Sequence, residues 1–322
     1  MNLNYRIHQE DRADLDQLEN KLYIYHLLLY IILYNNMSDI QIYKGKAFVM
    51  PYKKIKTQSK KVFTFDLDET LGSFGELYIL WEAITDYYKK VEELHDMDII
   101  FHNLLDLYPE FLRHGILNIL RYLYNKKLSG ECSKVFLYTN NQCYGLENSK
   151  WLSFLIGYIH SKICSQNTVL FDKIICAFKI NNQIMEPMRT THNKTYSDFI
   201  RCSLLPKSAE VCFIDNTYYQ KMLNDRVYYI QPRSYYHALS KEVILDRLVK
   251  QWMGPSLDYS FIHDRFSKYS IGSQKSSKLS VDIMVSQKIM YHLKEFFLLS
   301  TKGKKTKKIL VRLGRFTRKS RT

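Results

Sequence analysis

The chain has 322 residues, of which 46% are hydrophobic and 25% charged; this balance excludes a largely disordered protein and allows one or two folded domains. Its net charge is +15, but residues 302–322 hold ten Lys or Arg and no acid, so the rest carries 37 basic against 32 acidic groups, or +5. The six cysteines show no Cys-x-x-Cys pair and no histidine partners at zinc spacing. This excludes a zinc-finger class and favours a reducing compartment, the cytosol or the nucleus.

Residues 1–60 are interpreted as an N-terminal extension that ends in a basic linker, Lys53 to Lys61. The apolar stretch from Leu22 to Tyr34 covers thirteen residues, fewer than the roughly 20 that a helix needs to cross a bilayer. We therefore expect no membrane span. Two interpretations of this stretch remain open, a packed helix and a segment absent from the real product, for which Met37 would be the alternative start.

The first buried strand is predicted at Val62–Phe65, a short apolar run rich in β-formers. Asp66, Asp68 and Thr70 follow it directly. Charged groups at such a place are costly unless a metal or a phosphate compensates them. In open α/β sheets, ligands bind at the carboxyl ends of the strands. The pattern therefore predicts a ligand site at this end of the strand.

Residues 72–108 predict a helical insert. The first helix has apolar residues at steps of three and four. These residues are Leu77, Leu80, Trp81, Ile84, Tyr88, Val91 and Leu94. A second apolar segment runs from Ile99 to Tyr108, and Pro109 is expected to begin the next helix, where its missing N–H costs nothing.

The middle of the chain predicts two more strands. Lys134–Tyr138 is a second apolar strand, and it ends in the hydroxyl of Thr139, although a threonine at a strand end often only caps a turn. A helix over residues 149–163, with Ser149 as candidate N-cap, leads to a third strand at Phe171–Ile180. Asn181 and Asn182 then form a turn into a hairpin strand at Ile184–Met188.

A fourth apolar strand, Glu210–Ile214, ends in Asp215 and Asn216, and a fifth follows at Leu223–Ile230. Lys194 opens a predicted helix between the third and fourth strands, and a helix N-terminus adds partial positive charge for an anion. A solvent-exposed lysine is the alternative interpretation. Lys173 and Lys179 lie on or beside a strand and fit less well, and Arg189 is a further candidate contact for a phosphopeptide.

The C-terminal part carries fewer signals. Residues 240–252 predict a helix, residues 253–280 a linker that becomes Ser-rich, and residues 281–299 one more amphipathic helix. The polybasic tail, residues 300–322, is a candidate arm for nucleic acid or an acidic partner. A solvated end without a partner is the alternative.

Together these segments resemble the motifs of the haloacid dehalogenase (HAD) phosphatases. Asp66-Leu67-Asp68-Glu69-Thr70 is similar to the first motif, Thr139 to the second, Lys194 to the third and Asp215-Asn216 to the fourth. The residues of the first motif and the Asp-Asn pair look most like the corresponding motifs of the phosphatases that act on the RNA polymerase II C-terminal domain. The resemblance covers residues 60–250 and is weak in 72–108. For residues 72–108 two interpretations remain open: a cap over the active site, or a helical pair that completes the core.

The resemblance implies a role for each matched residue. Asp66 would be the nucleophile that forms an aspartyl-phosphate, and Asp68 the general acid and base. The phosphate would be bound by Thr139, Lys194 and Thr70. Mg²⁺ would be held by Asp66, Asp68 through its backbone carbonyl, Asp215 and Asn216.

The resemblance also implies a three-layer α/β fold. Its central parallel sheet would have five strands in the spatial order 5-4-1-2-3, with strands starting near Val62, Val135, Phe171, Val211 and Val227. The expected domains are the extension, a HAD core at 61–252 with its insert at 72–108, a linker plus helix at 253–299, and the tail.

Three functions remain open at this stage. The first is a Mg²⁺-dependent phosphatase for phosphoserine or phosphothreonine of proteins. The second is a HAD phosphatase for small metabolites or nucleic-acid 3′-phosphates, with the insert as its selective cap. The third is an adaptor with little turnover that recruits acidic partners through its basic tail.

Overall fold

A computed structural model describes most of the chain from residue 39 onwards. The described residues are 39–49, 60–141, 143, 151–165, 168–269 and 278–316, the last seventeen of these for the backbone only. The chain divides into two compact units, Met1–Asp39 and Ile40–Thr322. All helices and strands among the described residues belong to the second unit. The apolar stretch at 22–34, Ser149 and most of the basic linker lie outside the described residues.

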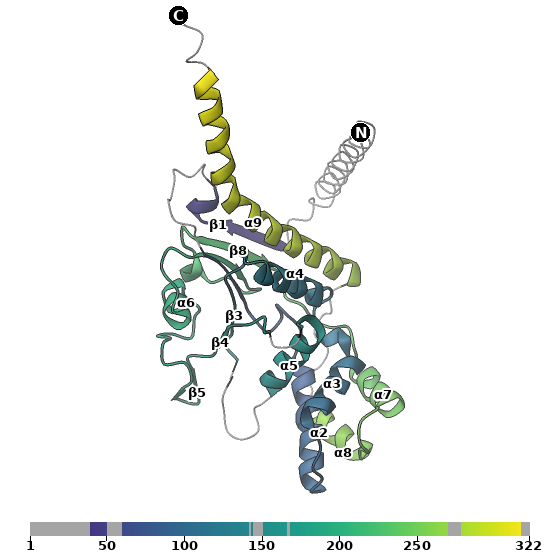
Figure 1. The fold of residues 1–322 in the computed structure, drawn as a ribbon. Helices are drawn as coiled ribbons and strands as arrows, with labels where there is room; N and C mark the ends of the chain where they lie inside the picture. The colour runs from purple at the N-terminus through teal and green to yellow at the C-terminus, as the bar shows by residue number, and fades with distance from the viewer. Residues whose placement is uncertain are drawn as a thin grey trace, which may run out of the picture. The chain divides into compact units, whose positions relative to one another are not determined.

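A six-stranded mixed sheet forms the centre of the second unit (Figure 1). Its strands are β1 (Ile40–Lys44), β2 (Lys61–Phe65), β3 (Lys134–Tyr138), β4 (Lys173–Ile175), β7 (Glu210–Ile214) and β8 (Val227–Pro232). Their spatial order is β1-β8-β7-β2-β3-β4, and every neighbouring pair is parallel except β1 with β8.

This order differs from the predicted five-stranded parallel sheet by the antiparallel strand β1 at one edge. Residues 40–44, which the sequence analysis assigned to the extension, therefore belong to the sheet. The predicted third strand is also too long. Only Lys173–Ile175 pairs with β3, and the chain then leaves the sheet for a hairpin of β5 (Lys179–Ile180) and β6 (Gln183–Ile184). Asn181 and Asn182 turn this hairpin at positive φ, as their side chains favour.

Eight α-helices have been assigned in the described residues. They are α2 (Gly75–Lys90), α3 (Met97–Leu107), α4 (Ile116–Leu128), α5 (Trp151–Ile163), α6 (Tyr196–Ser203), α7 (Lys241–Gln251), α8 (Tyr259–Tyr269) and α9 (Leu279–Phe316). Pro109 begins only a short 3₁₀ turn, Pro109–Phe111, and α4 starts later, after Gly115 at φ 72°. The segment 253–280, expected as a linker, contains α8.

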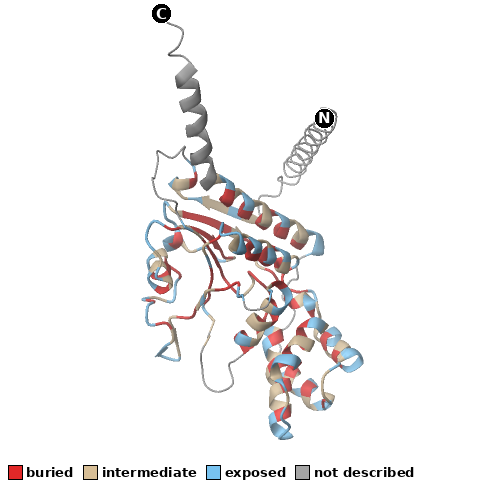
Figure 2. Ribbon diagram, viewed as in Figure 1, coloured by how far each residue is buried: buried red, intermediate tan, exposed pale blue. Residues whose placement is uncertain are grey.

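The central strands are buried on both faces, as is typical of parallel sheets (Figure 2). Phe63 and Phe65 of β2 belong to a cluster that includes residues of α4, α5 and α9. Val62 belongs to a second cluster on the opposite face, with Phe199 of α6. The strands thus have helices against both faces, which agrees with the predicted α/β class.

The insert pairs with helices from the far end of the chain. Trp81 of α2 packs edge-on against Phe101 of α3, and both rings belong to the buried cluster that reaches the sheet. Asp86 of α2 forms an ion pair with Arg265 of α8. These contacts favour the interpretation of the insert as a helical pair that completes the core.

Helix α9 covers the sheet next to α4 (Figure 1). Its Phe296 contacts Phe63 edge-on, at 5.1 Å between ring centroids. The predicted helix over 281–299 is confirmed, but its end is not, because the helical backbone continues through Phe316 into the polybasic segment. No helix in the described ranges combines the length and apolarity that a membrane crossing requires.

Glu295 links α9 to the edge of the sheet. It accepts from Lys44 Nζ of β1 at 2.7 Å and from the hydroxyl of Tyr228, and His292 Nδ1 lies 3.1 Å away. Burial alone would raise the pKa of Glu295, but the hydrogen bonds from His292, Lys44 and Tyr228 lower this pKa to about 2. The ionised carboxylate therefore stabilises the docking of α9.

We expect Glu295→Gln to lower the free energy of unfolding at pH 7 by about 1–2 kcal/mol, measured by urea denaturation. The folded-state pKa lies below the ordinary 4.5, so this stabilisation is present above pH 4.5 and is lost as the pH falls toward 2. The difference between wild type and variant should therefore shrink in acid. The exposed Glu92→Gln is the control, and a difference for Glu295→Gln that is independent of pH would contradict the account.

Candidate active site

Three strand ends meet at one edge of the sheet. Phe65 of β2 is in register with Leu137 of β3 and Ile214 of β7, so Asp66, Thr139 and Asp215 emerge from neighbouring parallel strands. Ladder hydrogen bonds continue into these residues: Asp66 N donates to Ile214 O at 2.8 Å, and Asp215 N to Ile230 O at 3.1 Å. The backbone of the site is therefore fixed by the sheet.

Lys194 lies between two of these carboxylates. Its Nζ donates to Asp215 Oδ2 at 2.6 Å and to Asp66 Oδ1, and the side chain is only 1% exposed. The rings of Tyr138 and Tyr219 flank the ammonium, with centroids 5.6 and 5.5 Å from Nζ. Burial alone would lower the pKa of Lys194, but Asp215 and Asp66 raise it above its ordinary value. The lysine is therefore a buried cation, and the exposed alternative is wrong.

The sequence around Lys194 explains its position. Thr195 caps α6, because its hydroxyl accepts from Asp198 N at 3.0 Å. Asp198 in turn binds Thr190 N at 3.1 Å and so holds the preceding loop onto the helix. These hydrogen bonds fix the backbone at the start of α6, directly after Lys194.

Asp68 faces a different partner. Its Oδ2 accepts from Asn141 Nδ2 at 3.2 Å. Burial and, after it, the charge of Asp66 raise the pKa of Asp68 to about 6. Burial likewise raises the pKa of Asp215, Lys194 opposes this rise and Asp66 adds to it, for a net value of about 7. Three carboxylates around one ammonium thus leave an excess of negative charge.

Thr70 joins the first motif to the fourth. Its Oγ1 lies 3.3 Å from Asp66 Oδ2 and 2.8 Å from Asn216 Oδ1, and it accepts from Asn216 N at 3.1 Å. Asn216 Nδ2 donates to Glu69 Oε2 and Ser234 Oγ, which orients the amide oxygen toward Thr70. A carboxylate oxygen and an amide oxygen therefore face one hydroxyl.

This donor set fits Mg²⁺, the metal that the resemblance implies. Hard cations take oxygen ligands, and the excess negative charge favours a divalent cation. Asp66 and Asn216 would hold it through these oxygens. Asp215, the further predicted ligand, accepts from Lys194 Nζ with one oxygen and from Thr217 N with the other. In the described part of the chain, no group of three or more His, Cys, Asp or Glu is arranged to hold a metal on its own.

Asn141 connects the remaining predicted residues. Its backbone N–H donates to Thr139 Oγ1 at 2.9 Å, and its side chain binds Asp68. The candidate residues thus form two hydrogen-bonded groups at the same edge of the sheet. One contains Asp66, Thr70, Lys194, Asp215 and Asn216, and the other contains Asp68 and Thr139, which Asn141 joins.

Arg113 is a functional-site residue that the sequence analysis missed. It is 2% exposed, and its guanidinium donates to the carbonyls of Thr70 at 2.6 Å, Glu69 at 2.5 Å and Arg233 at 2.8 Å. Burial lowers the pKa of Arg113 to about 10. The arginine fixes the turn of the first motif, where Glu69 has a φ of 60°. No spacing in the sequence marks an arginine forty residues away as its partner.

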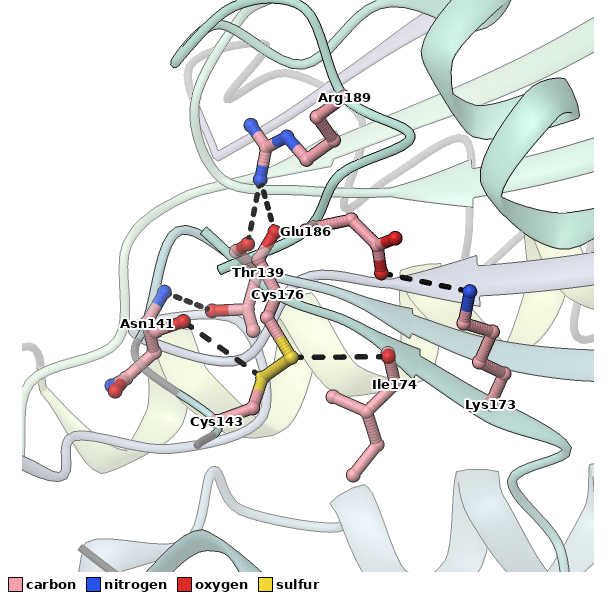
Figure 3. Close-up of a disulfide and its surroundings, with 8 residues drawn as sticks. All are labelled: Thr139, Asn141, Cys143, Lys173, Ile174, Cys176, Glu186 and Arg189. Atoms are coloured by element: carbon pink, nitrogen blue, oxygen red, sulfur yellow. Dashed lines mark hydrogen bonds and ion pairs between the residues drawn. A yellow bond between two sulfur atoms is a disulfide. The ribbon is translucent and has the colours of Figure 1, made fainter. Parts of the chain in front are cut away.

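Arg189 has a structural position instead of the expected phosphopeptide contact. It is 2% exposed and donates to the carbonyls of Thr139, Cys176 and His192 at 2.6–3.0 Å. Its guanidinium lies 4.9 Å from the centroid of Tyr138. These bonds tie the ends of β3 and β4 to the loop before Lys194 (Figure 3).

A disulfide between Cys143 and Cys176 lies beside this arginine (Figure 3). The sequence does not predict this disulfide, because the cysteines are 33 residues apart with no spacing signal. They meet because β3 and β4 are parallel neighbours and each cysteine follows the end of its strand.

Comparisons with models of known protein families, with curated proteins and with solved structures each found no match to this chain.

We expect Lys194→Met to lower the free energy of unfolding by roughly 3–5 kcal/mol, because it leaves two buried carboxylates without their cation. Urea denaturation at pH 7 measures this. The double variant Lys194→Met/Asp215→Asn should recover part of the loss. Lys162→Met, which breaks an exposed pair with Asp106 of 2.7 Å, is the control and should cost less than about 1 kcal/mol. Equal losses for the two lysines would refute the assignment.

Arg113→Met should lower the free energy of unfolding by about 2–4 kcal/mol, because three buried carbonyls lose their charged hydrogen-bond donor. Arg121→Met removes an exposed guanidinium that binds Lys162 O at 2.9 Å, and it should cost less than about 1 kcal/mol. Thermal and urea unfolding of the two variants side by side give the comparison. A loss for Arg113→Met no larger than that of the control would show that the turn of the first motif holds without it.

Proposed function

We propose that this protein hydrolyses phosphomonoesters through a phosphoryl group carried on Asp66, with serine or threonine phosphates of proteins as substrates. The observation that carries the proposal is the buried ammonium of Lys194, held between Asp66 and Asp215 at the carboxyl edge of the sheet. A fixed positive charge beside a fixed carboxylate is the arrangement that lets an anionic nucleophile meet an anionic substrate.

In the first step, an oxygen of Asp66 attacks the phosphorus in line with the ester oxygen. The P–O bond to the substrate breaks as the bond to Asp66 forms, giving an aspartyl-phosphate and an alcohol. Lys194 binds one Asp66 oxygen and Thr70 lies beside the other, so the carboxylate cannot rotate away. Such positioning lowers the entropy cost of bringing the carboxylate and the phosphate together.

Asp68 supplies the proton to the leaving alcohol. Its raised pKa of about 6 lets the carboxyl exist in both protonation states near neutral pH. In the second step the ionised Asp68 takes a proton from water, and the resulting nucleophile releases phosphate and restores Asp66. Acid–base help of this kind contributes about 10²- to 10⁴-fold in rate.

Lys194 and Thr139 stabilise the oxygens of the transferring phosphoryl group. The Thr139 hydroxyl accepts the N–H of Asn141, which orients it at the strand end. Mg²⁺, held by Asp66 and Asn216, would neutralise phosphate charge when bound. The substrate class rests on the likeness of the first and fourth motifs to phosphatases of the RNA polymerase II C-terminal domain.

Full-length protein with p-nitrophenyl phosphate and Mg²⁺ should show turnover that EDTA abolishes. Asp66→Asn should remove it to background, and Asp68→Asn should lower kcat by about 10²- to 10⁴-fold. Asp264→Asn, at a carboxylate that is 82% exposed, should leave turnover unchanged. Turnover by Asp66→Asn equal to wild type would overturn the proposal.

A panel of phosphoserine and phosphothreonine peptides, phosphometabolites and oligonucleotide 3′-phosphates then tests the substrate class. The proposal expects the highest kcat/KM among the phosphopeptides. A preference for metabolites or oligonucleotides would retain the chemistry and replace the substrate, whereas wild type without any metal-dependent turnover would favour an adaptor.

A further inference from the structure

We propose that Cys143 and Cys176 form a reversible redox site whose disulfide holds Asn141 against Asp68 and so supports catalysis. This inference rests on the proposed function for its effect on turnover. The disulfide itself and the hydrogen bonds of Asn141 are observations that stand apart from that function.

The pair lies at the same sheet edge as the candidate nucleophile. Cys176 directly follows β4 and is completely buried, while Cys143 follows β3 and is half-buried (Figure 3). The Cα atoms are 5.6 Å apart. Cys143 is therefore the more accessible partner of the pair.

The other four cysteines are free thiols. Burial raises the pKa of Cys132 to about 12 and that of Cys202 to about 11, and it also raises the pKa values of Cys164 and Cys212. Thiols of this kind are protonated at neutral pH and react slowly. Redox chemistry is thereby concentrated at the disulfide.

The contact with Asp68 is made two positions before Cys143 in the chain, by Asn141. Asn141 binds Asp68 Oδ2 through its side chain, donates its N–H to Thr139, and accepts from Ala177 N at 3.1 Å through its carbonyl. The disulfide joins Cys143 covalently to Cys176. Asn141 is thus held by hydrogen bonds, and Cys143 by a covalent bond.

Opening the disulfide would leave the neighbouring strand ends in place. The carbonyls of Thr139 and Cys176 remain bound by the buried guanidinium of Arg189 in either redox state. Strands β3 and β4 keep their ladder as well. We therefore expect the reduced protein to stay folded while Asn141 loses its fixed position beside Asp68.

The redox step is a thiol–disulfide exchange with a dithiol. A thiolate of the dithiol attacks Cys143 Sγ, the sulfur–sulfur bond breaks, and Cys176 leaves as a thiolate that takes up a proton. The second thiol of the reductant then displaces Cys143, which is protonated in turn. Two electrons and two protons pass from the dithiol, which becomes a disulfide, and an oxidised dithiol reverses the exchange. In reducing compartments, disulfides are usually transient and redox-sensing.

Full-length protein would be prepared in air and in dithiothreitol, and its thiols counted by alkylation in denaturant. The oxidised form should show the four free cysteines and the reduced form all six. With p-nitrophenyl phosphate, reduction should lower kcat roughly tenfold with KM changed less than about twofold, because the misplaced group acts in the chemical step.

Three variants separate the causes. Cys143→Ser/Cys176→Ser should have the low kcat of the reduced protein and no response to dithiothreitol. Cys164→Ser, at a half-buried free thiol, should respond as wild type does. Asn141→Ala should be as slow as the reduced protein in both states, which identifies Asn141 as the positioning residue.

Hydrogen exchange gives a readout that does not depend on turnover. The amides of Asn141 and Ala177 should exchange faster after reduction, while those of β3 remain protected. Six thiols in the air-prepared protein, equal or higher kcat after reduction, or unchanged exchange at these amides would each overturn the inference. No turnover in either state would instead overturn the proposed hydrolase, and with it the catalytic effect of the disulfide.

Discussion

An ammonium group that water cannot reach, shared by carboxylates from two neighbouring strands, is the interaction on which the site depends. Lys194 is 1% exposed and binds both Asp66 and Asp215, whose negative charges would repel each other without it. Removing one member of such a buried cluster leaves the other charges buried without a partner. The sheet register, the cap at Thr195 and the aromatic walls around the lysine all serve to keep this cluster assembled.

The sheet and the site could be predicted because both leave local signals. An apolar run that ends in a carboxylate or hydroxyl marks a buried strand and its functional edge at once, and this pattern located β2, β3 and β7 together with Asp66, Thr139 and Asp215. Parallel pairing then brings the strand ends together without further information. Lys194 was found less directly: the resemblance implies a lysine between the third and fourth strands, and the predicted helix start favoured Lys194 over Lys173 and Lys179.

The missed features depend on contacts between distant segments. Strand β1 is an edge strand whose pairing partner, β8, lies near residue 230, and Ile40–Lys44 alone shows little of it. Arg113 acts through carbonyls of the first-motif turn, and a carbonyl partner leaves no mark in the sequence. The Cys143–Cys176 bond is likewise a consequence of β3 and β4 being neighbours. The early end of β4 and the late start of α4 show that local propensity places boundaries poorly.

The central claim is that Asp66 carries the phosphoryl group during turnover. Rapid acid quenching of the Mg²⁺-loaded protein with substrate, followed by peptide mass spectrometry, measures this directly. The account predicts one added phosphoryl group on the peptide that contains Asp66 in wild type, and none in Asp66→Asn. Turnover in wild type with an unmodified Asp66 peptide at every quench time would contradict it.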